Sequence, residues 1–261
     1  MISGPAVQPN LETAARLVAE AAAAGARLVA LPEYFPFIGA TDAERLEARE
    51  REGDGPIQRF LSETAKKHGI WLVGGSLPMF GDDPGKQRNV CLAFDDQGRQ
   101  VARYDKIHLF GFRKGDESYD ESATIEAGTA PVAFDAPCGR VGLAICYDLR
   151  FPELFRALGT VDLLVIPAAF TDTTGRAHWE LLLRARAVEN QCHLLASAQG
   201  GRHPTGRLTH GNSMIIDPWG TVLARMDKGE GVVVAELDPA RTAEVRTALP
   251  ALQHKKLKGN P

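Results

Sequence analysis

The sequence predicts an α/β fold in which mixed sheets carry helices on their outer faces. Segments with helical periodicity alternate with short apolar runs along most of the chain, which is the pattern of strands connected by helices. A turn sequence also joins two adjacent strand-like runs, so antiparallel pairing is expected. The chain contains no repeat of fixed period and no low-complexity linker. We therefore expect residues 1–261 to form a single domain.

The first helix and strand are marked by the residues at their ends. Asn10 suits an N-cap, apolar residues follow it at helical spacing, and Gly25 suits a left-handed C-cap. The run 27–31 is short and mostly apolar, as in a buried strand, and Pro32 ends it. Glu33 is therefore expected directly beyond the carboxyl end of a strand.

A second helix and strand repeat this order before the chain forms a hairpin. The segment 56–69 begins with a proline and ends with a glycine, which favours a helix, and the strand 70–75 follows it. Two further strand-like runs, 89–94 and 99–104, are joined by Asp-Asp-Gln-Gly at 95–98. This turn chemistry predicts an antiparallel hairpin.

The middle of the chain returns to alternating strands and helices. The apolar run 140–145 predicts a buried strand that ends directly before a cysteine. A proline opens the predicted helix 152–159, and the strand 162–166 follows. A longer helix over 178–192 then leads into the strand 193–197.

The last third predicts short strands and a final capped segment. Strands are expected at 214–216, 222–224 and 232–235, and the Asp-Pro-Trp-Gly sequence at 217–220 predicts a turn between the first two. Asp238 suits the cap of the segment that follows.

Composition and charge exclude several classes of protein. Hydrophobic residues make up 44% of the chain and charged residues 24%, as in an ordinary soluble globular protein. The net charge of −3 gives no basic excess for nucleic acid, and no apolar run is long enough to span a membrane. The first basic residue is Arg16, so no signal peptide is expected. Four cysteines without a short repeated spacing suit reduced thiols, which predicts a cytoplasmic protein.

Three side chains with complementary chemistry follow three different predicted strands. Cys146 supplies a thiol, Glu33 a carboxylate that can accept its proton, and Lys106 a cation. A thiol needs such partners to act as a nucleophile because its ordinary pKa is about 8.5. The cation can lower the pKa of the thiol and stabilise an oxyanion. Because strand ends assemble sites from distant parts of a sequence, these residues are the predicted catalytic set.

Other interpretations of the same residues stay open at this point. Taken singly, each has an ordinary structural role as a buried cysteine, an exposed glutamate or a solvated lysine. A Cys–His hydrolase is an alternative, with a base drawn from His108, His178, His193, His203 or His210. No metal site is predicted, because the chain contains neither Cys-x-x-Cys nor His-Glu-x-x-His.

Six blocks of the sequence resemble the nitrilase superfamily of carbon–nitrogen hydrolases. The first is Leu-Pro-Glu at 31–33, and the second is Tyr-Asp-Lys-Ile-His-Leu at 104–109. The third is Gly-Leu-Ala-Ile-Cys-Tyr-Asp-Leu-Arg-Phe-Pro-Glu-Leu at 142–154. The remaining blocks are at 174–180, 184–189 and 217–220. They occur in the order of the family, and the similarity extends over nearly the whole chain.

This resemblance implies a four-layer αββα sandwich that assembles as a homodimer or a larger homo-oligomer. It implies a catalytic set of Glu33, Lys106 and Cys146, with Glu121 as a second glutamate beside them. In the implied reaction the Cys146 thiolate attacks an amide carbonyl to form a thioester, while Lys106 and the backbone N–H of Tyr147 stabilise the oxyanion. Glu33 moves the protons. Neither a metal nor an organic cofactor is implied.

Within the superfamily, the segment 198–203 is most similar to the deaminated glutathione amidase branch. Such an enzyme releases 2-oxoglutarate and cysteinylglycine, whereas the related ω-amidases act on 2-oxoglutaramate or 2-oxosuccinamate. Because these small-molecule amides are anionic, Arg202 and His203 are candidate substrate-binding residues. Phe170 and Trp179 are candidate aromatic residues of the pocket. A non-catalytic binding module with this fold is the alternative from another class.

The resemblance also bears on the start of the fold and on the other cysteines. Family members begin with a short strand before the segment that corresponds to 3–5, whereas this chain opens at 1–2 with Met-Ile. Either the first strand of the sandwich is absent, or the given sequence starts downstream of the natural start. Loss of a central strand would leave the backbone groups of its neighbours without partners. Cys91, Cys138 and Cys192 are expected to be packing residues.

Overall fold

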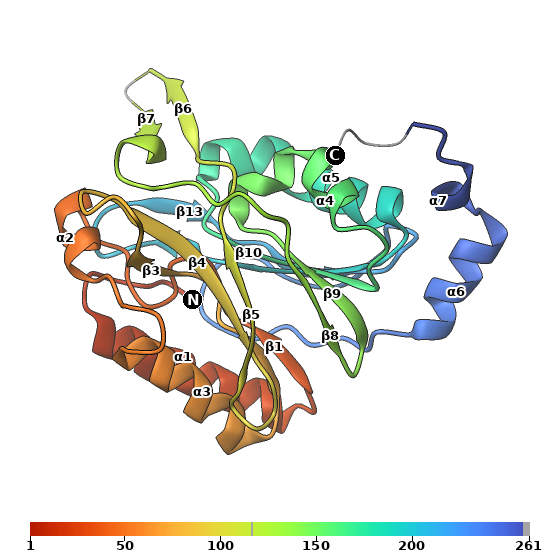
Figure 1. Cartoon of the computed structure of the whole chain (residues 1–261), viewed down its shortest axis with the longest axis horizontal. Helices are drawn as coiled ribbons and strands as arrows, with labels where there is room; N and C mark the ends of the chain where they lie inside the picture. The colour runs from red at the N-terminus through yellow and green to blue at the C-terminus, as the bar shows by residue number, and fades with distance from the viewer. Residues whose placement is uncertain (116, 258–261) are drawn as a thin grey trace.

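The computed structural model describes residues 1–115 and 117–257, and it contains two large β-sheets stacked face to face (Figure 1). The first sheet has the strand order β1-β2-β4-β3, with β5 paired to β4. Its strands are β1 (Leu28–Ala30), β2 (Trp71–Val73), β3 (Leu77–Phe80), β4 (Gln87–Phe94) and β5 (Gln100–Asp105). The second sheet has the order β15-β14-β11-β10-β9-β8. Its strands are β8 (Ala133–Ala136), β9 (Gly139–Leu143), β10 (Leu163–Ala168), β11 (His193–Ala198), β14 (Ser213–Ile216) and β15 (Val222–Met226).

Helices cover both outer faces of this pair of sheets (Figure 1). The first sheet packs against α1 (Val7–Ala23) and α3 (Pro56–His68), whose apolar side chains share one buried cluster with β2 and β4. The second sheet packs against α4 (Pro152–Ala157) and α5 (Asp172–Asn190). The layers therefore follow the order helix, sheet, sheet, helix, and the predicted αββα sandwich is confirmed.

Side-chain alternation along β4 explains how one strand serves two cores. Cys91 and Ala93 belong to the buried cluster between the sheets, whereas Val90 and Leu92 belong to the cluster beneath α1 and α3. Successive side chains of a strand point to opposite faces, so a strand that is apolar on both faces must lie inside a layered fold. The predicted hairpin is also confirmed, since β4 pairs antiparallel with β5.

The first helix begins earlier than its sequence signal indicates. α1 starts at Val7, so Asn10 lies inside the helix and is buried. Its side chain accepts a hydrogen bond from the Gly4 N–H at 2.9 Å and donates to the carbonyl oxygens of Gly4 and Pro36 at 2.9 and 2.8 Å. Asn10 therefore links the segment before α1 to the loop after Glu33. Its role is to form these tertiary hydrogen bonds and not to cap the helix.

The helix α5 also begins earlier than predicted. Thr171 is its N-cap, and the Thr171 hydroxyl accepts the Thr174 N–H at 3.2 Å. The predicted start is His178, whereas the helix also includes Asp-Thr-Thr-Gly at 172–175, residues of low helix propensity. The cap and the packing of the first turn outweigh that propensity.

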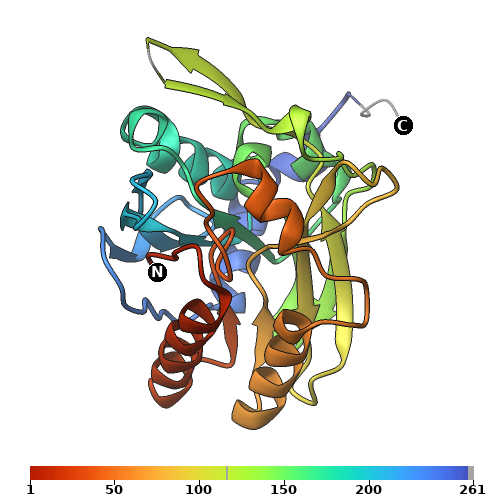
Figure 2. The same cartoon turned by 90° about the vertical axis from the view of Figure 1, so that its left-hand side faces the viewer.

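Most of the elements that the prediction omits are short. They are α2 (Asp42–Glu47), β3, the hairpin β6 (Gly111–Lys114) and β7 (Glu117–Asp120), η1 (Glu121–Ala123), β8, η2 (Cys146–Arg150), β12 (Gly200–Arg202), β13 (Leu208–His210) and α7 (Ala251–His254). The Asp238-capped segment is α6 (Pro239–Ala248). The β6–β7 hairpin projects from the body of the molecule (Figure 2). In the part of the chain that the structure describes, no helix is long and apolar enough to cross a membrane.

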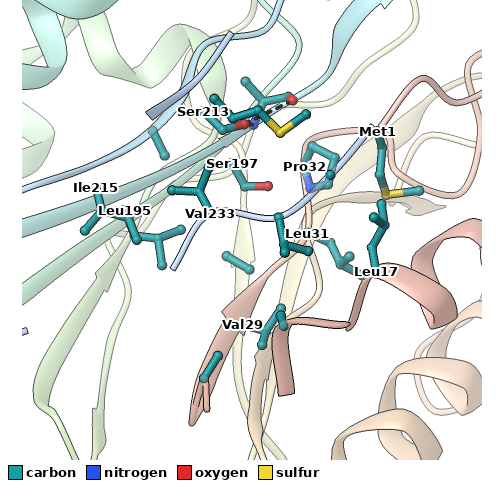
Figure 3. A pocket seen from close by; sticks show the side chains of 18 of the residues that line it. Met1, Leu17, Val29, Leu31, Pro32, Leu195, Ser197, Ser213, Ile215 and Val233 are labelled. Atoms are coloured by element: carbon teal, nitrogen blue, oxygen red, sulfur yellow. Dashed lines mark hydrogen bonds between the residues drawn. The ribbon is translucent and has the colours of Figure 1, made fainter. Parts of the chain in front are cut away.

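The edge of the first sheet borders an apolar groove. Residues 1–6 form no strand, and β1 pairs only with β2. The segment 232–235, predicted as a strand, is not one in the structure and belongs to neither sheet. Figure 3 shows the groove that remains between these segments, and its walls include Met1, Leu17, Val29, Leu195, Ile215 and Val233.

Candidate active site

Cys146 lies at a sharp turn after β9, where η2 begins. Its backbone has φ of +50°, in the left-handed region that residues other than glycine rarely adopt. The buried carboxylate of Asp148 holds this turn, because it accepts the Ile145 N–H at 2.9 Å and the Tyr104 hydroxyl at 2.7 Å. The turn therefore presents the thiol at the end of the strand in a fixed orientation.

Glu33 follows β1 and is only 1% exposed. Its Oε1 atom accepts hydrogen bonds from Asn89 Nδ2 at 3.0 Å and from Lys106 Nζ at 2.9 Å. Its Oε2 atom accepts the Ala169 backbone N–H at 2.9 Å. Strands from both sheets therefore fix this carboxylate, and donors satisfy both of its oxygens.

Lys106 follows β5, and its side chain is completely buried. Besides Glu33, its Nζ contacts Glu121 Oε2 at 2.8 Å and Glu121 Oε1 at 3.1 Å. Burial alone would lower the pKa of Lys106, but the charges of Glu121 and Glu33 outweigh it and hold the pKa well above its ordinary value. The ammonium group stays charged and directs all three of its N–H donors at carboxylates.

Glu121 begins η1, directly after the β6–β7 hairpin. The Phe110 N–H donates to its Oε2 at 2.7 Å, and the Tyr34 hydroxyl donates to its Oε1 at 3.1 Å. Burial opposes ionisation of this carboxyl, yet the neighbouring Lys106, Phe110 and Tyr34 donors lower its pKa. Glu121 is therefore a second carboxylate beside Lys106.

The surroundings of Cys146 favour the thiol over the thiolate. Burial is the main cause of a pKa well above the ordinary value, and the neighbouring carboxylate of Glu33 adds to the rise. Lys106 lowers the pKa, but burial and the charge of Glu33 outweigh its effect. The cation therefore lowers the pKa of the thiol as expected, although the net shift is upward. Ionisation of Cys146 thus requires a base, and Glu33 lines the same pocket.

The pocket around Cys146 measures about 280 Å³ and combines aromatic and cationic walls. It is lined by Glu33, Glu121 and Cys146, by Phe110, Tyr147 and Phe170, by Arg150 and Arg207, and by Ala169, Thr171 and Thr174. Arg150 lies over the ring of Phe170, with 5.2 Å from Cζ to the ring centroid. Among the described residues, neither arginine forms an ion pair with a carboxylate.

Arg202 and His203, the predicted substrate-binding residues, are not among the residues that line this pocket. Arg202 is exposed and donates to the Gly206 carbonyl oxygen at 3.4 Å. His203 is buried, with Nδ1 2.8 Å from the Ser3 carbonyl oxygen and Nε2 2.8 Å from the Thr209 hydroxyl. The β12–β13 hairpin turns Arg207 toward the pocket instead of these two residues.

The two predicted aromatic residues occupy different layers. Phe170 lines the pocket, as does Tyr147. Trp179 lies behind Phe170, 4.8 Å between ring centroids, and donates its indole N–H to the Asn212 carbonyl oxygen at 2.8 Å. Trp179 is therefore a core residue that supports the wall of the pocket.

None of the histidines lines the pocket of Cys146. His108 comes nearest in the chain to Lys106, but its Nδ1 atom lies 2.7 Å from Asp148, beneath the turn. The alternative of a Cys–His pair therefore lacks a base within reach of the thiol in this structure.

Sequence reasoning did not assign functions to Asn89, Tyr34, Arg150 and Arg207. Asn89 carried one signal, since it is a polar residue on the inward face of an apolar strand. Arg150 stands in the same block as Cys146, but nothing in the block shows that its side chain enters the pocket. Arg207 carried no signal, because its position depends on the pairing of two strands of three residues each.

Comparisons with known proteins agree with this geometry. The model of the carbon–nitrogen hydrolase family matches residues 4–247. The chain is 42% identical to a deaminated glutathione amidase from Synechocystis sp., covering 98% of this chain and 95% of that protein. It is 39% identical to human omega-amidase, covering 95% and 89% of the two chains. The crystal structure of the C. elegans NitFhit protein superposes with a TM-score of 0.87 at 38% identity, covering 98% of this chain and 63% of that one. The chain therefore belongs to the carbon–nitrogen hydrolase family.

Proposed function

We propose that this protein is an amidase that hydrolyses deaminated glutathione through a thioester on Cys146. The observation that carries the proposal is a thiol that shares its pocket with Glu33 and two arginines, beside the buried Lys106 that bridges Glu33 and Glu121. In the first half-reaction a bond forms between the sulfur and the amide carbon, and the carbon–nitrogen bond breaks. In the second, water cleaves the thioester to the carboxylic acid and restores the thiol.

Glu33 is the general base and acid of this reaction. It accepts the proton of the Cys146 thiol as the sulfur attacks, and it gives that proton to the departing amine. The same carboxylate then removes a proton from the hydrolytic water. Its contacts with Asn89, Lys106 and Ala169 keep it oriented through both halves.

Lys106 and the backbone of Tyr147 stabilise the oxyanion. Tyr147 is the second residue of η2, where backbone N–H groups have no acceptor within the helix. Without substrate, Lys106 donates two hydrogen bonds to the two oxygens of Glu121. One of these N–H groups can turn to the oxyanion while the other stays bonded to Glu121. Glu121 holds the ammonium group in place for that exchange.

The choice of substrate rests on charge and on the relatives. Arg150 and Arg207 supply two positive charges to a pocket whose two carboxylates already share Lys106. Deaminated glutathione has one carboxylate on the acyl side of its scissile amide and another on the amine side. The relatives named for this activity are about as similar to the chain as human omega-amidase is, so 2-oxoglutaramate is the second candidate substrate.

A comparative hydrolysis assay tests this proposal. Deaminated glutathione and 2-oxoglutaramate are assayed with the wild type, with Cys146→Ala and with Cys138→Ala as the matched control. We expect Cys146→Ala to lose at least about a thousandfold in kcat and Cys138→Ala to keep its activity. A higher kcat/KM for 2-oxoglutaramate would assign the enzyme to the ω-amidases. If the wild type hydrolyses neither compound, the proposal fails.

We also propose that the protein is a cytoplasmic homo-oligomer of one domain. The four cysteines are free, as expected of thiols in a reducing compartment. Large apolar side chains are exposed on one side of α5 and in the turn before β15, namely Leu181, Val188 and Trp219. Arg184 links that helix to the turn by donating to the Gly220 carbonyl oxygen at 2.9 Å. A second copy of the chain is the partner that this surface suits.

A further inference from the structure

We infer that Arg207 binds a carboxylate on the amine side of the scissile amide and thereby selects peptide-like amides over primary amides. This inference rests on the proposed amidase function and adds a specificity-determining residue to it. Three features of Arg207 support it: its unused donor, its place beside Glu33, and the hairpin that holds it.

Arg207 has a guanidinium group with spare hydrogen-bonding capacity at the pocket. One nitrogen, Nη2, donates to the Ala169 carbonyl oxygen at 3.2 Å. The Nε atom is buried and has no hydrogen-bond partner among the described residues. A buried donor without a partner is unfavourable, so this group is suited to an incoming oxygen anion.

The backbone of Ala169 places Arg207 on the side of the departing amine. The Ala169 carbonyl binds Arg207, and the Ala169 N–H binds Glu33 Oε2 at 2.9 Å. In the proposed reaction Glu33 protonates the departing amine, so the amine portion of the substrate leaves from beside this same residue. A carboxylate carried by that portion then lies next to the guanidinium group.

The hairpin fixes the position of Arg207 through His203. The His203 N–H donates to the Arg207 carbonyl oxygen at 2.8 Å, which closes the turn between β12 and β13. The buried His203 ring bridges Ser3 and Thr209, and burial lowers its pKa, which keeps the ring neutral. His203 is therefore a positioning residue, and Arg202 on the same hairpin points to solvent.

This arrangement predicts which substrates depend on Arg207. Cysteinylglycine, the amine released from deaminated glutathione, ends in a carboxylate. The amine released from 2-oxoglutaramate is ammonia, which has no group for Arg207 to bind. Both substrates share the 2-oxo acid portion, so a comparison between them isolates the amine side.

The experiment measures kcat/KM for both substrates in Arg207→Met and Arg207→Lys, with Arg202→Met as the matched control. We expect Arg207→Met to lower kcat/KM for deaminated glutathione by about 10- to 100-fold, the usual effect of removing a charge-assisted hydrogen bond. The same variant should hydrolyse 2-oxoglutaramate at nearly the wild-type rate. Arg207→Lys should recover part of the loss, because it keeps the charge without the planar fork, and Arg202→Met should match the wild type.

Two results would overturn the inference. One is an equal loss for both substrates, which would place Arg207 on the acyl side or in a structural role, and the other is no loss for either. If the wild type hydrolyses neither substrate, the proposed function fails, and the role of Arg207 is then tested by binding alone.

In that case calorimetry compares the affinities for cysteinylglycine and cysteinylglycinamide. The inference requires the carboxylate form to bind more tightly and Arg207→Met to remove the difference, and any other binding result contradicts it.

Discussion

Two residues of the site, Cys146 and Tyr34, have left-handed backbone conformations that side chains disfavour. Their φ angles are +50° and +54°, respectively. Such conformations cost about 1 to 3 kcal/mol and persist only where surrounding contacts hold them. Asp148 binds the turn of Cys146, and the Ser76 hydroxyl accepts the Tyr34 N–H at 3.0 Å. The catalytic geometry is therefore built into the folded chain before substrate binds.

Removing the charge of Glu33 should make the Cys146 thiol more reactive toward alkylation and at the same time slow amide hydrolysis. Because the Glu33 charge helps to raise the pKa of Cys146 and Lys106 lowers it, Glu33→Gln should lower that pKa and increase the thiolate fraction at neutral pH. Alkylation of Cys146 by iodoacetamide should therefore become faster. Amide turnover should fall by about 10²- to 10⁴-fold, since the general base is lost.

Peptide mass spectrometry gives the alkylation rate for this variant, and a substrate assay gives the turnover. In the wild type, the rate should keep rising from neutral to alkaline pH, because the raised pKa of Cys146 leaves the thiol protonated at neutrality. Cys192 serves as an internal control: it is buried, and burial raises its pKa to about 12. A plateau of wild-type alkylation below pH 8 would contradict the assignment of a protonated thiol.

Asn89 should orient Glu33 without binding substrate. Its Nδ2 atom donates to Glu33 Oε1 at 3.0 Å, and Asn89 is absent from the lining of the pocket. Asn89→Ala should lower kcat by about tenfold, the effect of one lost hydrogen bond to a charged group, and leave KM nearly unchanged. Steady-state kinetics checks this split. A rise in KM with unchanged kcat would instead place Asn89 in substrate binding.

Only those residues of the site that stand in short local sequence motifs could be predicted from the sequence. Glu33, Lys106 and Cys146 each follow a recognisable strand. In the structure Glu33 and Cys146 line one pocket, and Lys106 contacts Glu33 at 2.9 Å. Arg202 and Arg207 show the limit, because which of them faces the pocket depends on the register of a small hairpin. The rise in the pKa of Cys146 was also beyond sequence reasoning, since it depends on burial and on the nearby charge of Glu33.

At the scale of single elements, a distant carboxylate caps the N-terminus of α3. Glu50 is buried, and its carboxylate accepts the Ile57 N–H at 2.6 Å and the Gln58 N–H at 3.1 Å. A Cβ atom at Gly55 would lie 2.2 Å from this carboxyl group, so the glycine is required there. The proline start of α3 was readable from sequence, but the cap was not, because it comes from outside the helix.

Removing that cap should destabilise the protein measurably. Glu50→Ala leaves two helix N–H groups buried without partners, which should cost about 2 kcal/mol. For a chain of this size the change corresponds to a fall in Tm of roughly 4 to 8 °C. Differential scanning calorimetry of Glu50→Ala beside the exposed Glu47→Ala tests this. An equal Tm for the two variants would show that the cap contributes nothing.

For the whole molecule, the two sheets share one buried interface and should unfold together. Trp71 of the first sheet stacks on Phe134 of the second with ring centroids 6.1 Å apart. Far-UV circular dichroism and tryptophan fluorescence should therefore report the same midpoint in a denaturant titration. Two separated transitions would contradict the proposal of a single domain.

The layer order was predictable from sequence only through family resemblance, because alternating strands and helices also fit other α/β arrangements.

The proposed oligomer depends on the exposed apolar side chains of α5. Leu181 is 68% exposed and Val188 is 47% exposed, which is unusual for two large apolar residues on one helix. Leu181→Asp should shift the protein to the monomer, because a charge at an interface between copies must lose its water. Light scattering after size-exclusion chromatography measures the mass, with Glu180→Asp as a control. A monomeric wild type would end this proposal.

The central claim is that Cys146 forms a thioester with the acyl part of an amide. It is tested most directly by quenching the enzyme with acid during turnover and measuring the mass of the peptide that contains Cys146. The account predicts a mass increase equal to the substrate acyl group minus one hydrogen on this peptide, and none on peptides that contain Cys91, Cys138 or Cys192. Turnover with no acyl adduct on Cys146, together with full activity in Cys146→Ala, would contradict it.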